Sequence, residues 1–153
     1  MNKEATGRDA RAGLWRWTEE VRKLLQAGET VEFTPKGLSM WPTLRPKTDT
    51  VCVRPTAEYA RMDIVLAATE GPAGVVLHRV MRKEGGTYTL MGDANLYQTE
   101  TCTEQEILGK VVTIRRNGKN VTAGTANRLL RRVHASSPAL RRTMVRIMNL
   151  IRR

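Results

Sequence analysis

Gly37-Leu38-Ser39-Met40-Trp41-Pro42-Thr43-Leu44 is the stretch on which the interpretation of this chain depends. It lies between two runs that are predicted as strands, residues 30–33 and 50–53. Gly37 permits backbone angles that other residues resist, and Pro42 fixes its own φ and favours an extended residue before it. A serine on such a constrained turn presents its hydroxyl at a fixed angle. Because serine is also common in ordinary turns, local chemistry alone leaves open a capped turn with a packed tryptophan.

Short strands are predicted on both sides of this stretch, from residue 29 to about residue 122. Gly85-Gly86 and Asn117-Gly118 are typical of hairpin turns. The expected strands cover residues 31–33, 50–54, 63–67, 75–82, 87–91, 108–115 and 120–122, with a turn or short helix at 103–106. Many short strands joined by glycine turns predict a mainly β, mostly antiparallel domain.

A helix is predicted before the strands, over residues 9–27, and Gly28 is well placed to end it. Its apolar residues recur on one face at helical spacing: Leu14, Trp17, Val21, Leu24 and Leu25. This pattern indicates a helix packed on the domain. A docking or membrane-surface element that uses Trp15 and Trp17 is the alternative.

The C-terminal tail, residues 126–153, contains eight Arg and no acidic residue, which leaves +3 of the net charge of +11 for the rest of the chain. Two helical pieces are predicted in it. The first has Leu129, Leu130 and Val133 on one face, and the second starts with Ser137 as N-cap and Pro138 at the first helical position. The second piece has an apolar stripe, with arginines on the rest of its circumference: Leu140, Met144, Ile147, Met148 and Ile151, against Arg141, Arg142, Arg146, Arg152 and Arg153.

A basic amphipathic helix of this kind is typical of elements that lie in a membrane interface. The alternative is packing on a partner or on the chain's own domain, with the stripe against Leu14, Val21 and Leu25. The chain is thus divided into an N-terminal helix (residues 1–28), a β domain (29–125) and a basic helical tail (126–153).

The composition narrows the remaining classes of protein. The N-terminal residues lack an apolar h-region, so no secretory signal is expected, and the longest apolar run, residues 64–68, is far short of a membrane span. Cys52 and Cys102 match no metal-ligand spacing and are predicted to be small, partly buried apolar residues. We therefore expect no metal and no cofactor, and a location in the cytoplasm or at a membrane face.

Four segments, in order, resemble those of the type I signal peptidase family of serine peptidases. The opening stretch resembles its Ser-Met-x-Pro-Thr-Leu nucleophile segment. The other three are Met62-Asp63-Ile64-Val65-Leu66, Leu77-His78-Arg79-Val80 and Gly92-Asp93-Ala94-Asn95, which resemble a Gly-Asp-Ile-Val strand, the general-base segment and a Gly-Asp-Asn segment. The resemblance covers about residues 31–115. It implies a twisted, partly coiled β fold.

The resemblance also implies the reacting groups. Ser39 is the expected nucleophile, and a serine hydroxyl needs a base within hydrogen-bond reach. The bacterial pattern has a lysine base where this chain has His78, so the chain resembles the archaeal and endoplasmic-reticulum branch with its Ser/His pair. Imidazole groups titrate near neutrality and suit the transfer of the serine proton. His134, in the arginine-rich tail, has no such context.

A third group usually orients the base, and Asp93 is the best candidate. It could instead brace the turn before Asn95. The His-type branch has an acid a few residues further on, where only Glu100 could substitute. Asp49 and Asp63 are expected to hold strand ends and turns, and Arg79 is expected to have a structural or electrostatic role.

The oxyanion and the substrate are assigned by the same resemblance. The backbone N–H of Ser39 is the expected oxyanion donor. Many relatives add a serine hydroxyl two residues before the nucleophile, but this position is Gly37 here, so the chain has no such hydroxyl. The expected substrate-binding residues are Gly37, Met40 and Pro42.

The favoured function is a serine endopeptidase that cleaves an extended precursor or leader peptide, with small side chains near the scissile bond. Signal peptidases normally carry a membrane anchor that this sequence lacks, so we expect a dedicated precursor rather than bulk secretory processing. One alternative is a self-cleaving peptidase like the SOS-repressor family, cut at Ala12-Gly13 or Ala27-Gly28. Another alternative is a non-catalytic module that binds lipid or nucleic acid. Nucleic acid is the less well supported ligand, because aromatic residues make up only 5% of the chain.

Overall fold

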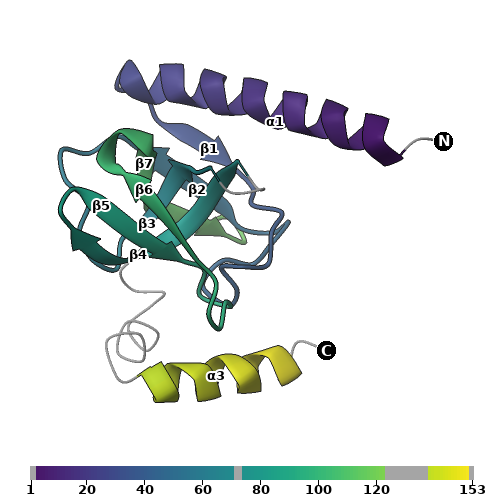
Figure 1. Cartoon of the computed structure of the whole chain (residues 1–153), viewed down its shortest axis with the longest axis vertical. Helices are drawn as coiled ribbons and strands as arrows, with labels where there is room; N and C mark the ends of the chain where they lie inside the picture. Colours follow the sequence, from purple (N-terminus) through teal and green to yellow (C-terminus); the bar gives the residue numbers. More distant parts are fainter. Residues whose placement is uncertain (1–2, 71–73, 123–137, 152–153) are drawn as a thin grey trace.

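The computed structural model describes residues 3–70, 74–122 and 138–151, and it is built around one antiparallel sheet (Figure 1). The strands follow the order β1-β2-β7-β3-β4-β5-β6, and β8 pairs with β7 off this path. The sheet is not closed, so β1 and β6 end the path. The elements are α1 (Lys3–Gln26), β1 (Val31–Phe33), β2 (Thr50–Arg54), β3 (Ile64–Ala68), β4 (Val75–Glu84), β5 (Thr87–Met91), β6 (Thr99–Thr103), the short 3-10 helix η1 (Glu104–Glu106), β7 (Ile107–Arg116), β8 (Lys119–Thr122) and α3 (Pro138–Ile151).

The sheet coils so strongly that it encloses two hydrophobic cores. The register shifts at three places: the extra residue lies in β7 opposite β2 and again opposite β3, and in β4 opposite β5. Such bulges bend a strand and increase its twist. β3 lies between the cores: Ile64 and Leu66 point into the first, whereas Val65 and Ala67 point into the second. A strand buried on both faces needs a continuous apolar run, which is what residues 64–68 provide. The expectation of a mainly β, partly coiled antiparallel fold is confirmed.

The predicted strands are present, with ends that differ by one or two residues, and η1 occupies the predicted turn or short helix. β6 was not predicted. Its sequence, Thr-Glu-Thr-Cys-Thr, has only one buried side chain, Cys102, so it has no apolar alternation. The alternating threonines were the available signal, since β-branched residues favour strands. This omission matters because β6 carries one of the site residues.

α1 is longer than predicted but ends where expected. Gly28 has a φ of +82°, and the N–H groups of Gly28 and Glu29 bond to the carbonyls of Leu25 and Leu24, which is the Schellman arrangement. Val21 and Leu25 are buried in the first core, and each such side chain contributes about 1.5 to 3 kcal/mol by leaving water. α1 therefore shares a core with the β domain.

α3 begins at Pro138, as predicted, and lies on the other side of the β domain from α1 (Figure 1). Packing of its stripe against Leu14, Val21 and Leu25 is therefore excluded. Val145 is fully buried, and the Arg142 guanidinium lies 4.9 Å from the centroid of the Tyr97 ring. The predicted first helical piece of the tail, with Leu129, Leu130 and Val133, lies outside the described residues.

Candidate active site

Ser39 lies on the loop between β1 and β2, which is folded into tight turns. The Trp41 N–H bonds to the Leu38 carbonyl at 3.0 Å and the Leu44 N–H to the Met40 carbonyl at 2.9 Å, around a cis Trp41-Pro42 bond. Met40, Thr43 and Leu44 are buried, whereas Ser39 is half-buried. Buried side chains on both sides of the serine thus hold the backbone while its hydroxyl stays at the surface of a cleft.

The segment after β5 supports this turn from behind. The Ala94 N–H donates to the Ser39 carbonyl at 2.7 Å. A Cβ at position 92 would lie 2.6 Å from that carbonyl oxygen and 2.9 Å from the Ser39 Cβ, so only glycine fits there. The close approach of Gly92 explains why this segment contains a glycine, and it fixes the position of the serine relative to β5.

Ser39, His78 and Glu100 form a continuous line of polar contacts. Ser39 Oγ is 2.9 Å from His78 Nε2, and His78 Nδ1 is 2.7 Å from Glu100 Oε2. An ionised carboxylate can only accept a hydrogen bond, so Nδ1 carries a hydrogen and Nε2 is left to accept the serine hydroxyl. This is the arrangement in which an imidazole takes a proton from a nucleophile.

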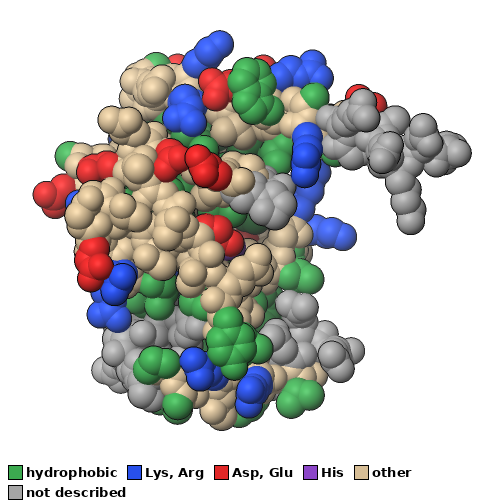
Figure 2. Space-filling view, viewed as in Figure 1, with side chains coloured by type: hydrophobic (Ala, Val, Ile, Leu, Met, Phe, Trp, Pro, Cys, Tyr) green, Lys and Arg blue, Asp and Glu red, His purple; other side chains and the backbone are tan. Residues whose placement is uncertain are grey.

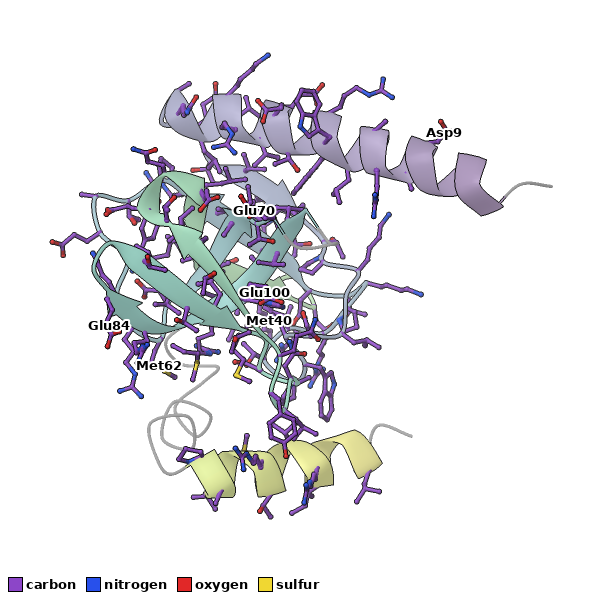
Figure 3. All side chains as sticks on the ribbon, viewed as in Figure 1. Asp9, Met40, Met62, Glu70, Glu84 and Glu100 are labelled. Atoms are coloured by element: carbon purple, nitrogen blue, oxygen red, sulfur yellow. The ribbon has the colours of Figure 1, made fainter. Side chains whose placement is uncertain are left out.

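The sheet brings the base and the acid together from separate strands. His78 lies two residues before Val80 on β4; Val80 is opposite Leu90 of β5, and Leu90 is opposite Glu100 of β6. Side chains two residues apart on a strand share a face, so this register places His78 and Glu100 on the same face. The His78 and Glu100 side chains are only 6% and 16% exposed, which shields their contact from water. Glu100 and Met40 both lie near the middle of the domain in Figure 3.

Asp93 does not meet the base, so the expectation that it orients His78 is wrong for this geometry. Its two carboxylate oxygens each accept a hydrogen bond from Arg79 at 2.7 Å, and the Thr43 hydroxyl donates to the second. Arg79 follows His78 on β4 and therefore points to the opposite face. Asp93 and Arg79 are 0% and 1% exposed. Through the Thr43 hydroxyl the pair ties the nucleophile loop to β4, a structural role that differs from the expected bracing of the turn before Asn95.

A second ion pair braces the far end of the same loop. Arg116 donates from Nε and Nη2 to Asp49 at 2.9 and 2.6 Å, and the Arg45 N–H donates to Asp49 at 2.8 Å. Burial by itself would raise the pKa of the Asp49 carboxyl, but the hydrogen bonds from Arg116 and Arg45 outweigh it and lower that pKa. Asp63 accepts from the Ala60 N–H at 2.9 Å and pairs with Lys110. Both aspartates hold turns, as expected.

The serine and the histidine open onto a cleft of about 710 Å³. Of the expected substrate-binding residues, Gly37 and Met40 line this cleft, whereas Pro42 is not among its lining residues. The lining is mostly apolar, and it comes from α1, β1, the loop after β1, β3, β4 and β6, with Asn95 and Gln98 from the segment before β6. Within the described ranges, no group of three or more His, Cys, Asp or Glu is placed to hold a metal ion.

In a comparison with protein families, residues 15–112 match a family described as Peptidase S24-like. The matched segment is more than half of the chain and includes Ser39, His78 and Glu100. No curated protein matches the sequence. From the sequence, Glu100 was considered only after Asp93 as the group that orients the base. The β propensity of residues 99–103 was the signal that could have favoured Glu100.

Proposed function

Because the chain belongs to the Peptidase S24-like family of serine peptidases, we propose that it is an endopeptidase with Ser39 as nucleophile, His78 as general base and Glu100 as the group that orients the base. The observation that carries the proposal is the unbroken contact line from Ser39 Oγ through His78 to Glu100, at 2.9 and 2.7 Å. Serine hydroxyls are weak nucleophiles until a base lies within this distance.

The contacts support acyl transfer in two stages. Ser39 Oγ attacks the substrate carbonyl carbon while its proton passes to His78 Nε2, and the imidazolium that forms is stabilised by the Glu100 carboxylate. His78 then donates this proton to the leaving amine as the C–N bond breaks. A water molecule, deprotonated by the same base, hydrolyses the acyl-enzyme and restores Ser39. The backbone N–H of Ser39 remains the expected oxyanion donor, since Gly37 offers no hydroxyl.

An extended peptide is the substrate shape that fits the cleft. β1 ends the strand order, and the chain that follows it, from Thr34 to Gly37, lines the cleft up to Ser39. An open edge of this kind accepts a peptide as an added strand. We propose a dedicated precursor or leader peptide as the substrate, with small side chains next to the scissile bond.

Cleavage of another chain is favoured over self-cleavage. Ala12-Gly13 lies inside α1, and Ala27-Gly28 lies in the Schellman turn that ends it. Both peptide bonds would have to leave helical hydrogen bonds before they could be bound in extended form. The base is also a histidine, whereas the self-cleaving SOS-repressor type resembled by the sequence uses a lysine.

The proposal is tested with Ser39→Ala and an internally quenched peptide library. We expect Ser39→Ala to lose all hydrolysis, with an unchanged melting temperature, because the hydroxyl is half-buried and its removal leaves the turn contacts intact. Thr48→Ala is a matched control, since it removes an exposed hydroxyl from the same loop. Hydrolysis by Ser39→Ala at the wild-type rate contradicts the proposal.

We further propose that α3 attaches the protein to an anionic membrane surface. Val145 is buried on one side of the helix, whereas Leu140, Ile147 and Leu150 are 53%, 52% and 70% exposed. Residues at i, i+7 and i+10 share a helical face, so this apolar face points away from the domain. Exposed Arg146 lies beside this face, whereas the Arg142 guanidinium is directed to the Tyr97 ring of the domain. Apolar and basic side chains are adjacent over α3 in Figure 2.

Each arginine near an anionic surface contributes about 1 kcal/mol, screened by salt. No described helix is long and apolar enough to cross a bilayer. We expect the full-length protein to float with phosphatidylglycerol vesicles at low salt, and Ile147→Asp/Leu150→Asp to stay in solution. Leu24→Asp, at an exposed apolar position on α1, is the control and should still float. Equal flotation of the double variant and wild type contradicts the proposal, as does wild-type protein that never floats.

A further inference from the structure

α1 changes its role along its length. Val21 and Leu25, near its C-terminal end, are buried in the first core. Leu14 and Trp17, one to two turns earlier, instead line the cleft that contains Ser39 and His78. A helix that only covered the sheet would not need to reach this cleft. Its contribution to the lining gives α1 a direct position beside the substrate.

The cleft wall at this place is an apolar corner made of Leu14, Trp17 and Phe33. The Trp17 and Phe33 rings meet edge to face, with centroids 5.3 Å apart. Both rings are only half-buried, and Leu14 is 38% exposed. The corner therefore keeps apolar surface in contact with water, and a further apolar side chain would remove that surface from water.

We propose that this apolar corner is a specificity subsite, which binds one large aliphatic or aromatic side chain of the peptide substrate at a position away from the scissile bond. The inference rests on the proposed peptidase function, because it places a peptide in the cleft. Its basis is continuity: the corner and the Ser39/His78 pair line one cavity of about 710 Å³, within the range that ligand pockets usually have. Small side chains beside Ser39 would leave the corner unfilled.

Trp15 provides a matched control within the same helix. It is 68% exposed and is not among the residues that line the cleft. Trp15→Ala and Trp17→Ala make the same chemical change two residues apart, but only Trp17 lines the cleft, and it also packs against the first core and Phe33. Leu14→Ala is the second test variant, because an exposed leucine on a helix surface is replaced by alanine with little effect on folding.

The experiment measures binding to the inactive Ser39→Ala protein, so that it does not depend on turnover. The probes are fluorescein-labelled octapeptides of alternating alanine and serine, with a single leucine placed at each position in turn. Anisotropy titrations should show that leucine at one position tightens binding roughly 10- to 100-fold, the gain expected from burying one such side chain. Trp17→Ala and Leu14→Ala should lose most of this gain, and Trp15→Ala should keep it.

Three results would overturn the subsite. The first is that leucine tightens binding at no position. The second is that the gain survives in both Leu14→Ala and Trp17→Ala, and the third is that Trp15→Ala loses the gain to the same extent. If Trp17→Ala does not fold, Leu14→Ala alone decides the question. Wild-type protein is assayed in parallel for cleavage of the same peptides: a lack of Ser39-dependent hydrolysis contradicts the peptidase proposal, whereas the leucine dependence of binding tests the subsite by itself.

Discussion

Glu100→Gln is the substitution that separates the site described here from a Ser/His pair without a third group. The carboxylate accepts a hydrogen bond from His78 Nδ1 at 2.7 Å, and only 16% of its side chain is exposed. A hydrogen bond to a charged group of this kind contributes about 1.5 to 3 kcal/mol, which corresponds to roughly 10- to 200-fold in rate. The amide adds a second defect, because its NH₂ can donate to Nδ1 and favour the tautomer in which Nε2 no longer accepts from Ser39. We therefore expect kcat to fall by about 10³- to 10⁴-fold.

Asp93→Asn is the comparison for this prediction, because it changes the other candidate carboxylate. Breaking the buried pair with Arg79 leaves an uncompensated charge and should lower the free energy of unfolding by about 3 to 5 kcal/mol. The loss of activity should then follow the loss of folded protein. Glu100→Gln should instead keep its melting temperature within a few degrees of wild type. Steady-state kinetics and thermal unfolding on both variants check this contrast.

The reasoning is refuted if Glu100→Gln retains half or more of the wild-type kcat while Asp93→Asn, fully folded in the same buffer, loses activity. That outcome would return the orienting role to Asp93. A pH–rate profile that still rises above pH 9 would instead point to a lysine base, with Lys36 the lysine that lines the cleft.

Three further predictions concern the surroundings of the site. Gly92→Ala should displace Ser39, because the new Cβ would lie 2.6 Å from its carbonyl oxygen; we expect a destabilisation of about 1 to 3 kcal/mol in urea unfolding and a larger loss of kcat than of substrate binding. Asp49→Asn should lower the free energy of unfolding by about 2 kcal/mol at neutral pH, the scale of a charged hydrogen bond. The pKa of Asp49 is lower in the folded state, so the stabilisation from this carboxylate is complete above its unfolded-state pKa and is lost as the pH falls through its folded-state pKa. The difference in free energy of unfolding between Asp49→Asn and wild type should therefore shrink in acid. A difference that stays constant from pH 7 to strong acid would contradict this. Burial raises the pKa of the Cys102 thiol to about 11, so iodoacetamide at pH 8 should label it slowly in the native protein and rapidly in urea, and equal rates in the two states would show that it is not buried.

Much of this protein could be predicted from local sequence because the relevant forces act over a few residues. Period-two alternation and the Gly85-Gly86 and Asn117-Gly118 turns predict most of the strands. The apolar face from Leu14 to Leu25 predicts α1. The turn chemistry around Ser39 and the segment around His78 identify the two reacting side chains, since a nucleophile and a base are recognised by residue type.

Only the tertiary structure decided which carboxylate meets the base. Asp93 and Glu100 both follow His78 in the sequence by about 15 to 22 residues, so the sequence alone does not separate them. In the structure Arg79 binds Asp93 on the face of the sheet opposite to His78. Glu100 reaches His78 because β5 and β6 pair in one particular register, and a shift of one residue would turn it to the other face. This register is set by the pairing of three whole strands, β4, β5 and β6, with an irregularity between Val80 and Arg82, so no local pattern in residues 98–100 could reveal it. The same holds for the apolar corner, because Leu14 and Trp17 become cleft residues only when α1 packs beside β1.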